Sequence, residues 1–242
     1  MKSNPISRIT TVALVAAISL SFSLQALAEE VNESRPANPD GRIQFQAVTG
    51  DFQVIGHNDD SFRLEGELGE DVEELIIEGS ADSWTIELEP IKSNQGWYDN
   101  MTSSDLTLYV PHSAQIKVNV VSADLDVEDL DGERVEAKSV SGDVMLRNVR
   151  PQRLNAASVS GELTVEGGGQ RETKLTTVSG DLEVSELFGR IELQSVSGDI
   201  TAEGYEVSSF EVESVSGDID AILEPLEQAS IEINVHSGDI HL

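Results

Sequence analysis

Ser195-Val196-Ser197-Gly198-Asp199-Ile200 recurs along the chain at a nearly fixed interval, and this repetition determines the fold that the sequence predicts. Close copies share the pattern Ser/Thr-Val-Ser-Gly-Asp/Glu followed by an aliphatic residue, and they span 139–144, 158–163, 177–182 and 214–219. Degenerate copies lie at 121–125, at 236–240 and, far upstream, at 48–52. From Ala123 through Gly142, Gly161, Gly180, Gly198 and Gly217 to Gly238, successive reference positions are 19, 19, 19, 18, 19 and 21 residues apart. A fixed period near 19 residues predicts a solenoid.

Each repeat has two short arms in which apolar and polar residues alternate. Val135 and Ala137 illustrate the arm before the glycine, and Val144 and Leu146 the arm after it. Alternation with period 2 is typical of a strand with one buried face. The last inward position of the first arm and the first inward position of the second arm are an odd number of residues apart. In one continuous strand, one of the two apolar sets would therefore face outward. The repeated Ser/Thr-Val-Ser-Gly-Asp/Glu stretch, which we call the box, is therefore predicted to form a corner. Its Gly takes positive φ, and the following Asp or Glu accepts hydrogen bonds from the turn backbone.

These patterns predict an all-β protein built as a parallel β-helix, or β-solenoid, with a period of about 19 residues. The solenoid is expected over 43–242, with regular repeats in 116–242 and a less regular β region in 43–115 that caps the stack. Residues 29–42 are polar, acidic and carry two prolines, which predicts a flexible acidic leader. Residues 92–104 are expected to form a surface loop.

The first 28 residues have the composition of a secretory signal peptide. Lys2 and Arg8 precede an apolar run, and Ala26-Leu27-Ala28 forms a small-x-small cleavage site before Glu29. The chain has no Cys, so neither a lipoprotein attachment site nor a disulfide is available. No other apolar run approaches the roughly 20 residues that span a bilayer. We expect an exported protein of the periplasm or cell surface, with no membrane anchor in the mature chain.

Charge narrows the classes of partner. The chain carries a net charge of -30, and loss of Lys2 and Arg8 leaves 13 basic against 45 acidic residues, a net charge of -32. Such a field disfavours nucleic acid and anionic lipid, and it favours cations or cationic partners.

The acidic residue of the box is the main candidate for a metal site, since a metal pair formed by His236 and His241 is less favoured than simple substitution in the final, frayed coil. Stacked coils place equivalent residues roughly 4.8 Å apart. The predicted carboxylate ladder consists of Asp124, Asp143, Glu162, Asp181, Asp199, Asp218 and Asp239. Two hypotheses stay open: the ladder recruits Ca²⁺, or each carboxylate caps its own turn and is solvated. Calcium-binding solenoid repeats are about nine residues long and rich in glycine, whereas this repeat has one box glycine in about 19 residues, which favours capping.

The sequence predicts no catalytic and no cofactor-binding residue. A glycosidase needs one distinctive carboxylate pair with separated pKa values, whereas these acidic residues recur at one structural position. No serine lies in a Gly-x-Ser-x-Gly elbow, and Gly167-Gly168-Gly169 lacks the Lys-Ser/Thr of a phosphate loop. A carbohydrate-active β-helix enzyme remains the alternative to a binding protein.

A family resemblance agrees with this interpretation. Leu-Thr-Leu-Tyr-Val-Pro at 106–111, then Ile116-Lys117-Val118 and the tandem boxes, resembles an exported bacterial family labelled "putative adhesin", over about residues 40–242. The resemblance implies a β-solenoid and supplies no catalytic residue. The resulting prediction is a non-enzymatic interaction module of the cell envelope or surface, whose partner is a protein, peptide or glycan, cationic ones included.

Overall fold

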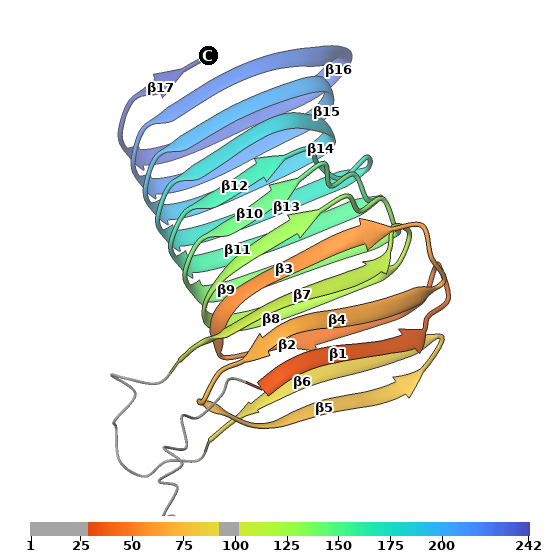
Figure 1. The fold of residues 1–242 in the computed structure, drawn as a ribbon. Coiled ribbons are helices and arrows are strands. Elements are labelled where there is room, and N and C mark those ends of the chain that lie inside the picture. The colour runs from red at the N-terminus through yellow and green to blue at the C-terminus, as the bar shows by residue number, and fades with distance from the viewer. Residues whose placement is uncertain (1–28, 92–101) are drawn as a thin grey trace, which may run out of the picture.

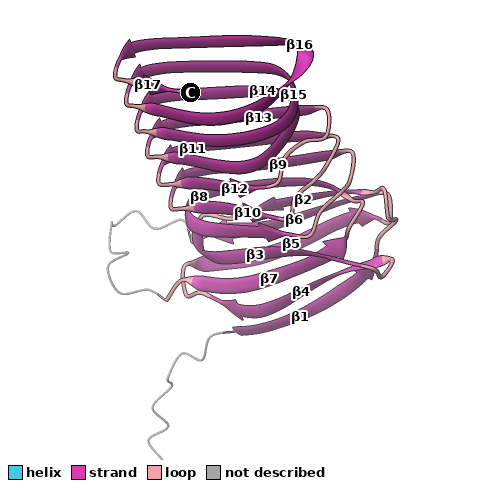
Figure 2. Ribbon diagram, turned by 90° about the horizontal axis from the view of Figure 1, so that it is seen from above, coloured by secondary structure: helices cyan, strands magenta, loops and turns pink. Residues whose placement is uncertain are grey.

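The structure, a computed structural model, describes residues 29–91 and 102–242; the predicted signal peptide and most of the predicted 92–104 loop lie outside the described residues. The described chain contains 17 strands and no helix, so it has no helical segment that could cross a membrane. Flattened coils stack into a rod (Figure 1 and Figure 2). The predicted β-solenoid with coils of about 19 residues is confirmed.

Two faces run along the rod, and each coil contributes one arm to each face. We call them face A and face B. In spatial order, face A contains β5 (Val72–Ser80), β6 (Ser83–Pro90), β2 (Arg42–Gln46), the first part of β8 (Gln115–Glu128), β9 (Arg134–Ser141), β11 (Arg153–Ser160) and β13 (Glu172–Ser179). Face B contains β1 (Glu29–Pro36), β4 (Ser61–Leu68), β7 (Ser104–Pro111), β3 (Thr49–His57), the second part of β8, β10 (Val144–Arg147), β12 (Leu163–Glu166) and, at the far end, β17 (Ile240–His241). Both faces are continued by β14 (Leu182–Ser197), β15 (Ile200–Ser216) and β16 (Ile219–Ser237).

The core lies between the two faces and is filled by the alternating residues that the sequence indicates. Val135 and Ala137 of β9 and Val144 and Leu146 of β10 are at most 1% exposed. Parallel pairing keeps equivalent residues in register from coil to coil, as for Leu146 beside Val165. Because the register is kept, each buried row continues along the rod, and one elongated core results.

The box forms the corner between the faces, as predicted. Its glycines share a positive φ, between 109° and 145°, at Gly142, Gly161, Gly180, Gly198, Gly217 and Gly238. A Cβ on Gly180 would lie 2.2 Å from the carbonyl oxygen of Gly161 in the preceding coil. The first residue of each close copy of the box is a buried Ser or Thr whose side chain points inward. In one copy, the Ser139 hydroxyl donates a hydrogen bond to the Ser141 carbonyl at 3.1 Å. Glycine is therefore required at these six corners, whereas Ala123 occupies the equivalent position of the first regular coil without a positive φ.

The N-terminal part departs from the sequence expectation in two ways. The flexible leader predicted for 29–42 is wrong, because its first eight residues form β1, which pairs antiparallel with β4 and buries Val31. The coils also do not stack in chain order. The arms β2 and β3 lie between β8 on one side and β6 and β7 on the other. The hairpin β5–β6 and the antiparallel pair β1–β4 then complete this end of the rod.

Candidate functional site

The predicted carboxylate ladder exists, and its hydrogen bonds join one coil to the next. The Oδ1 atom of Asp124 accepts the backbone N–H of Asp143 at 2.9 Å, and Asp199 accepts that of Asp218 at 2.8 Å. The same bond, at 2.8–2.9 Å, is made by the pairs Asp143/Glu162, Asp181/Asp199 and Asp218/Asp239. The expectation that each carboxylate caps its own turn is therefore corrected: five of the seven, Asp124, Asp143, Asp181, Asp199 and Asp218, cap the turn of the following coil.

One rung of the ladder is missing. The carboxylate of Glu162, longer by one methylene, accepts the hydroxyl of Thr164 at 3.2 Å, and the backbone N–H of Asp181 has no side-chain acceptor among the described residues. Within residues 29–91 and 102–242, no group of three or more His, Asp or Glu side chains is placed to hold a metal ion. The ladder carboxylates thus act as hydrogen-bond acceptors that join successive coils.

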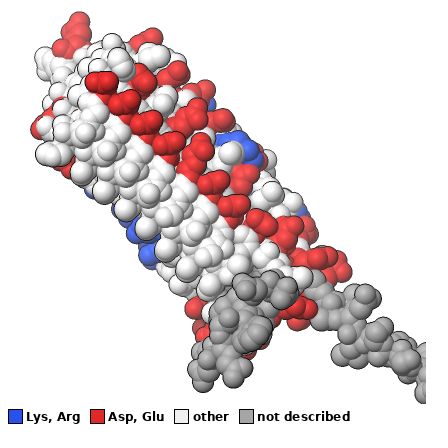
Figure 3. Space-filling view, turned by 90° about the vertical axis from the view of Figure 1, so that its left-hand side faces the viewer, with Lys and Arg blue, Asp and Glu red and all other residues white. Residues whose placement is uncertain are grey.

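A row of exposed valines runs beside the ladder. These are the second residues of the boxes, which we call the valine ridge: Val121, Val140, Val159, Val178, Val196 and Val215, each 41–51% exposed. They point outward at the corner, so burial does not require them to be apolar. Figure 3 shows the result as an uncharged band along the rod beside rows of carboxylates. The sequence carries this signal, since Val recurs at an outward position that the alternation of buried residues does not explain.

A groove of about 510 Å³ borders the ridge on face A. Its lining includes three ridge valines together with Gln194, Glu213 and Asn234. The inward hydroxyl residues Ser195 and Ser214 lie at its base. Ser214 is 6% exposed, and its Oγ has no hydrogen-bond partner. The groove therefore combines apolar contact, one negative charge and amide groups, whereas the buried Ser214 hydroxyl is out of reach of a ligand.

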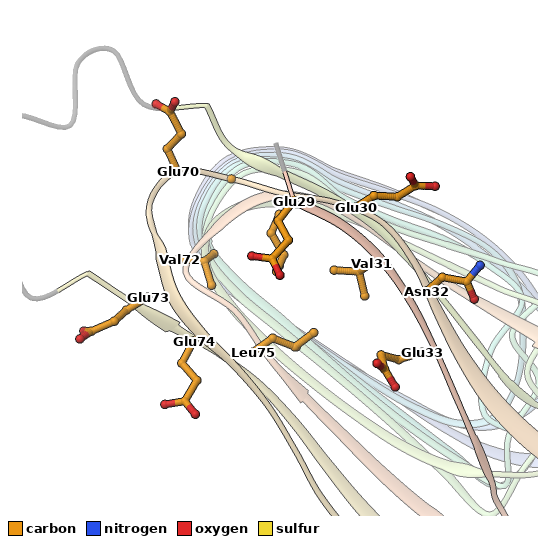
Figure 4. A pocket seen from close by; sticks show the side chains of 12 residues that line it. Glu29, Glu30, Val31, Asn32, Glu33, Glu70, Val72, Glu73, Glu74 and Leu75 are labelled. Carbon is orange, nitrogen blue, oxygen red and sulfur yellow. The ribbon is translucent and has the colours of Figure 1, made fainter. Parts of the chain in front are cut away.

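A second hollow, of about 550 Å³, lies at the N-terminal end of the rod between β1 and β5. Its lining includes Val31, Val72 and Leu75, which point into the hollow, and six glutamates (Figure 4). Glu73 and Glu74 point away from it. Because the carboxylates do not converge, they form an acidic rim around an apolar floor and not a cation cage.

One carboxylate pair has a distinct environment. Asp126 and Glu128 of β8 share a guanidinium nitrogen of Arg147 on the next coil, at 2.5 Å for the Asp126 contact. Burial raises the pKa of Asp126 against the opposing charge of Arg147, and the hydrogen bond to Glu128 raises the pKa of Arg147. The guanidinium occupies the position between the two carboxylates that a substrate would need, so this is a structural ion-pair network.

The fold and these surfaces define a class, a β-solenoid with repeated outward ladders. A family model described as Toastrack DUF4097 matches residues 74–242, and the chain belongs to this family. Comparison with curated proteins gives no match.

Two solved structures of low sequence identity match the chain, and the first of them supports the fold. A "putative lipid binding protein" from Parabacteroides distasonis is 15% identical with a TM-score of 0.54, and the match covers 87% of this chain and 96% of that one. A "putative adhesin" from Bacteroides fragilis is 16% identical with a TM-score of 0.47, covering 88% and 97% of the two chains. At such identities the similarity concerns the fold alone.

Proposed function

We propose that this protein is a non-catalytic interaction module of the bacterial cell envelope, which binds extended cationic segments along the valine ridge and the carboxylate ladder. The observation that carries the proposal is the juxtaposition of the two rows, an exposed apolar row and an anionic row that follow the same corner over successive coils. A partner with alternating apolar and basic side chains satisfies both rows at once.

Charge and the groove support this kind of partner. The acidic excess of the chain steers cationic segments towards the rod over long range. At close range, the ridge valines offer apolar surface whose burial favours binding. The Gln194 and Asn234 amides in the groove can hydrogen-bond an extended backbone. A second copy of the chain is disfavoured as the partner, because it carries the same negative charge.

Export and the lack of catalysis belong to the same proposal. The leader at 1–28 directs the chain to the periplasm or the cell surface. The carbohydrate-active alternative needs a carboxylate pair open to substrate, whereas Asp126 and Glu128 are both engaged by Arg147. A screen against polysaccharides should therefore show no turnover.

Binding of a synthetic peptide of alternating Lys and Val tests the proposal. Affinity should fall steeply between 0.15 M and 1 M salt, because the Debye length shortens from about 8 Å to about 3 Å. Val178→Ser combined with Val196→Ser should weaken binding roughly tenfold or more at every salt concentration. Ile222→Ser is the matched control, since Ile222 is 69% exposed and lies off the ridge. Equal affinity of the ridge variant and the control would refute the proposal.

A further inference from the structure

Face A carries a basic strip in an otherwise acidic molecule. Two neighbouring hollows, of about 310 Å³ and 400 Å³, share Arg153 and lie where the variable turns enter face A. We call their basic lining the arginine strip: Arg42, Lys117, Arg134, Arg153, Arg171 and Arg190. Their acidic lining is Glu133, Glu136 and Glu172, so six basic against three acidic side chains leave the two hollows a net charge of +3. The whole chain, by contrast, carries -30.

The strip is built by the coil register. Arg134 pairs with Arg153 in the next coil, and Glu172 and then Arg190 continue the same row. Like charges placed directly opposite each other on neighbouring strands destabilise a sheet. The pairing of Arg134 with Arg153 therefore destabilises the sheet. A carboxylate at either position would remove this repulsion, and carboxylates are abundant in this chain.

Four members of the strip have free guanidinium groups. Across residues 29–91 and 102–242, Arg42, Arg134, Arg171 and Arg190 make no ion pair within 4.0 Å and no side-chain hydrogen bond. Arg153 is the exception, since it contacts Glu133 at 2.5 Å. Each guanidinium presents five N–H donors in a planar fork that fits phosphate or carboxylate in bidentate fashion. The strip thus holds donors without acceptors in a chain rich in acceptors.

The surroundings of Glu136 in the strip favour its charged form. The hydrogen bond from Lys138 holds the pKa of Glu136 below its usual value, and the charges of Lys138, Lys117 and Arg134 act in the same direction. The carboxylate ladder lies beyond the other end of β9. At roughly 3.3 Å per residue, the eight residues of that strand separate the two rows by about 23 Å. This is more than two Debye lengths at 0.15 M salt.

We propose that the arginine strip is a binding site for ligands that carry several phosphate groups in series. The strip spans neighbouring coils, so its donors recur at about 4.8 Å or multiples of it, and one phosphate can engage two guanidinium groups. The inference goes beyond the proposed function, because it assigns a second surface to a partner of opposite charge. It also qualifies the expectation from net charge that anionic surfaces are excluded.

The arrangement predicts an unusual salt dependence. At 0.01 M salt the Debye length is about 30 Å, so the acidic excess of the whole rod repels a polyanion. Near 0.15 M the distant carboxylates are screened while contacts inside the hollows persist. At 1 M these contacts are screened as well. Binding should therefore be strongest at intermediate salt, unlike the steady decline expected for the cationic peptide.

Inorganic polyphosphate and vesicles are the probes, used with the mature chain. Vesicles of phosphatidylglycerol with phosphatidylcholine present phosphate on a lipid surface, and pure phosphatidylcholine vesicles serve as the neutral control. Arg134→Gln with Arg190→Gln removes one free guanidinium from each hollow. Arg35→Gln with Arg150→Gln is the matched control, since it removes equal charge from ion-paired arginines outside both hollows. The thermal midpoint of each variant shows whether it has folded.

The expected result is binding of polyphosphate, of phosphatidylglycerol vesicles or of both, weakened at least tenfold in the strip variant and less than twofold in the control. Binding of polyphosphate alone identifies a soluble polymer as the source of phosphate, and binding of the vesicles alone identifies a lipid headgroup. Glu136→Gln should strengthen binding, because it removes a negative charge from the strip. The inference is overturned if neither probe binds or if both double variants lose affinity equally. The cationic peptide assay on the same variants keeps this outcome separate from that of the proposed function, because the strip variant should bind the peptide normally.

Discussion

Completing the carboxylate ladder should stabilise the protein. Glu162 is the member of the carboxylate ladder that bonds within its own coil, to Thr164. In Glu162→Asp the shorter side chain can accept the free backbone N–H of Asp181 through Oδ1, as the other ladder carboxylates do for the following coil. A side-chain oxygen that caps a backbone N–H contributes about 0.5–2 kcal/mol. Loss of the Thr164 hydrogen bond offsets part of this gain. The expected net gain is about 0.5–1 kcal/mol.

The reverse change supplies the matched comparison. Asp199→Ala removes an existing rung and leaves the backbone N–H of Asp218 without its acceptor. It should cost about 1 kcal/mol, which at a urea m-value of about 2 kcal/mol/M lowers the midpoint by about 0.5 M. Equilibrium urea unfolding followed by circular dichroism measures both variants. If Glu162→Asp is no more stable than the parent while Asp199→Ala is unchanged, the bonds between coils do not contribute to stability.

Three further predictions concern the corner, the pH dependence and metal binding. Gly180→Ala should destabilise by about 2 kcal/mol or more, because backbone strain at positive φ adds to a Cβ contact with the Gly161 carbonyl; in Gly168→Ala the new Cβ first meets the end of the Leu187 side chain, so a smaller shift of the urea midpoint is expected. Glu136→Gln should cost about 0.2–1 kcal/mol at pH 7. Because the folded-state pKa of Glu136 is lowered, this cost is fully present above the unfolded pKa and disappears as the pH falls through the folded pKa, which unfolding curves from pH 7 to pH 3 would follow. Millimolar Ca²⁺ should leave the thermal midpoint unchanged, because the ladder oxygens already accept backbone N–H groups; a rise that a chelator reverses would show that the ladder binds the cation.

The regular part of the fold could be predicted because each coil repeats the same local rules. Alternation identified the buried residues of both arms, and the odd step across the box located the corner at Gly142 and its equivalents. The irregular end could not be predicted in the same way. Only Val31 is a buried apolar residue in β1, and its partner strand begins at Ser61. No local signal indicates that β6 and β7 stack outside β2 and β3.

The candidate surfaces were only partly predictable. Repetition located the carboxylate ladder, but the partner of each carboxylate depends on how the coils stack. Part of the arginine strip lies in one row of equivalent positions, which also includes an acidic residue. The row consists of Arg134, Arg153, Glu172 and Arg190. Writing the repeats one below another would have brought these residues into one column. Net charge hid the strip, because an average over the chain carries no information about where the few basic residues lie.

Valine methyl NMR during titration with the Lys-Val peptide tests the central claim most directly. The exposed ridge valines and buried valines such as Val118, Val127 and Val144 give separate probes within one sample. The account predicts that the ridge signals shift together and saturate with one dissociation constant, while the buried signals stay in place. Shifts confined to Val31 and Val72 at the N-terminal hollow, or binding that moves no ridge signal, would contradict it.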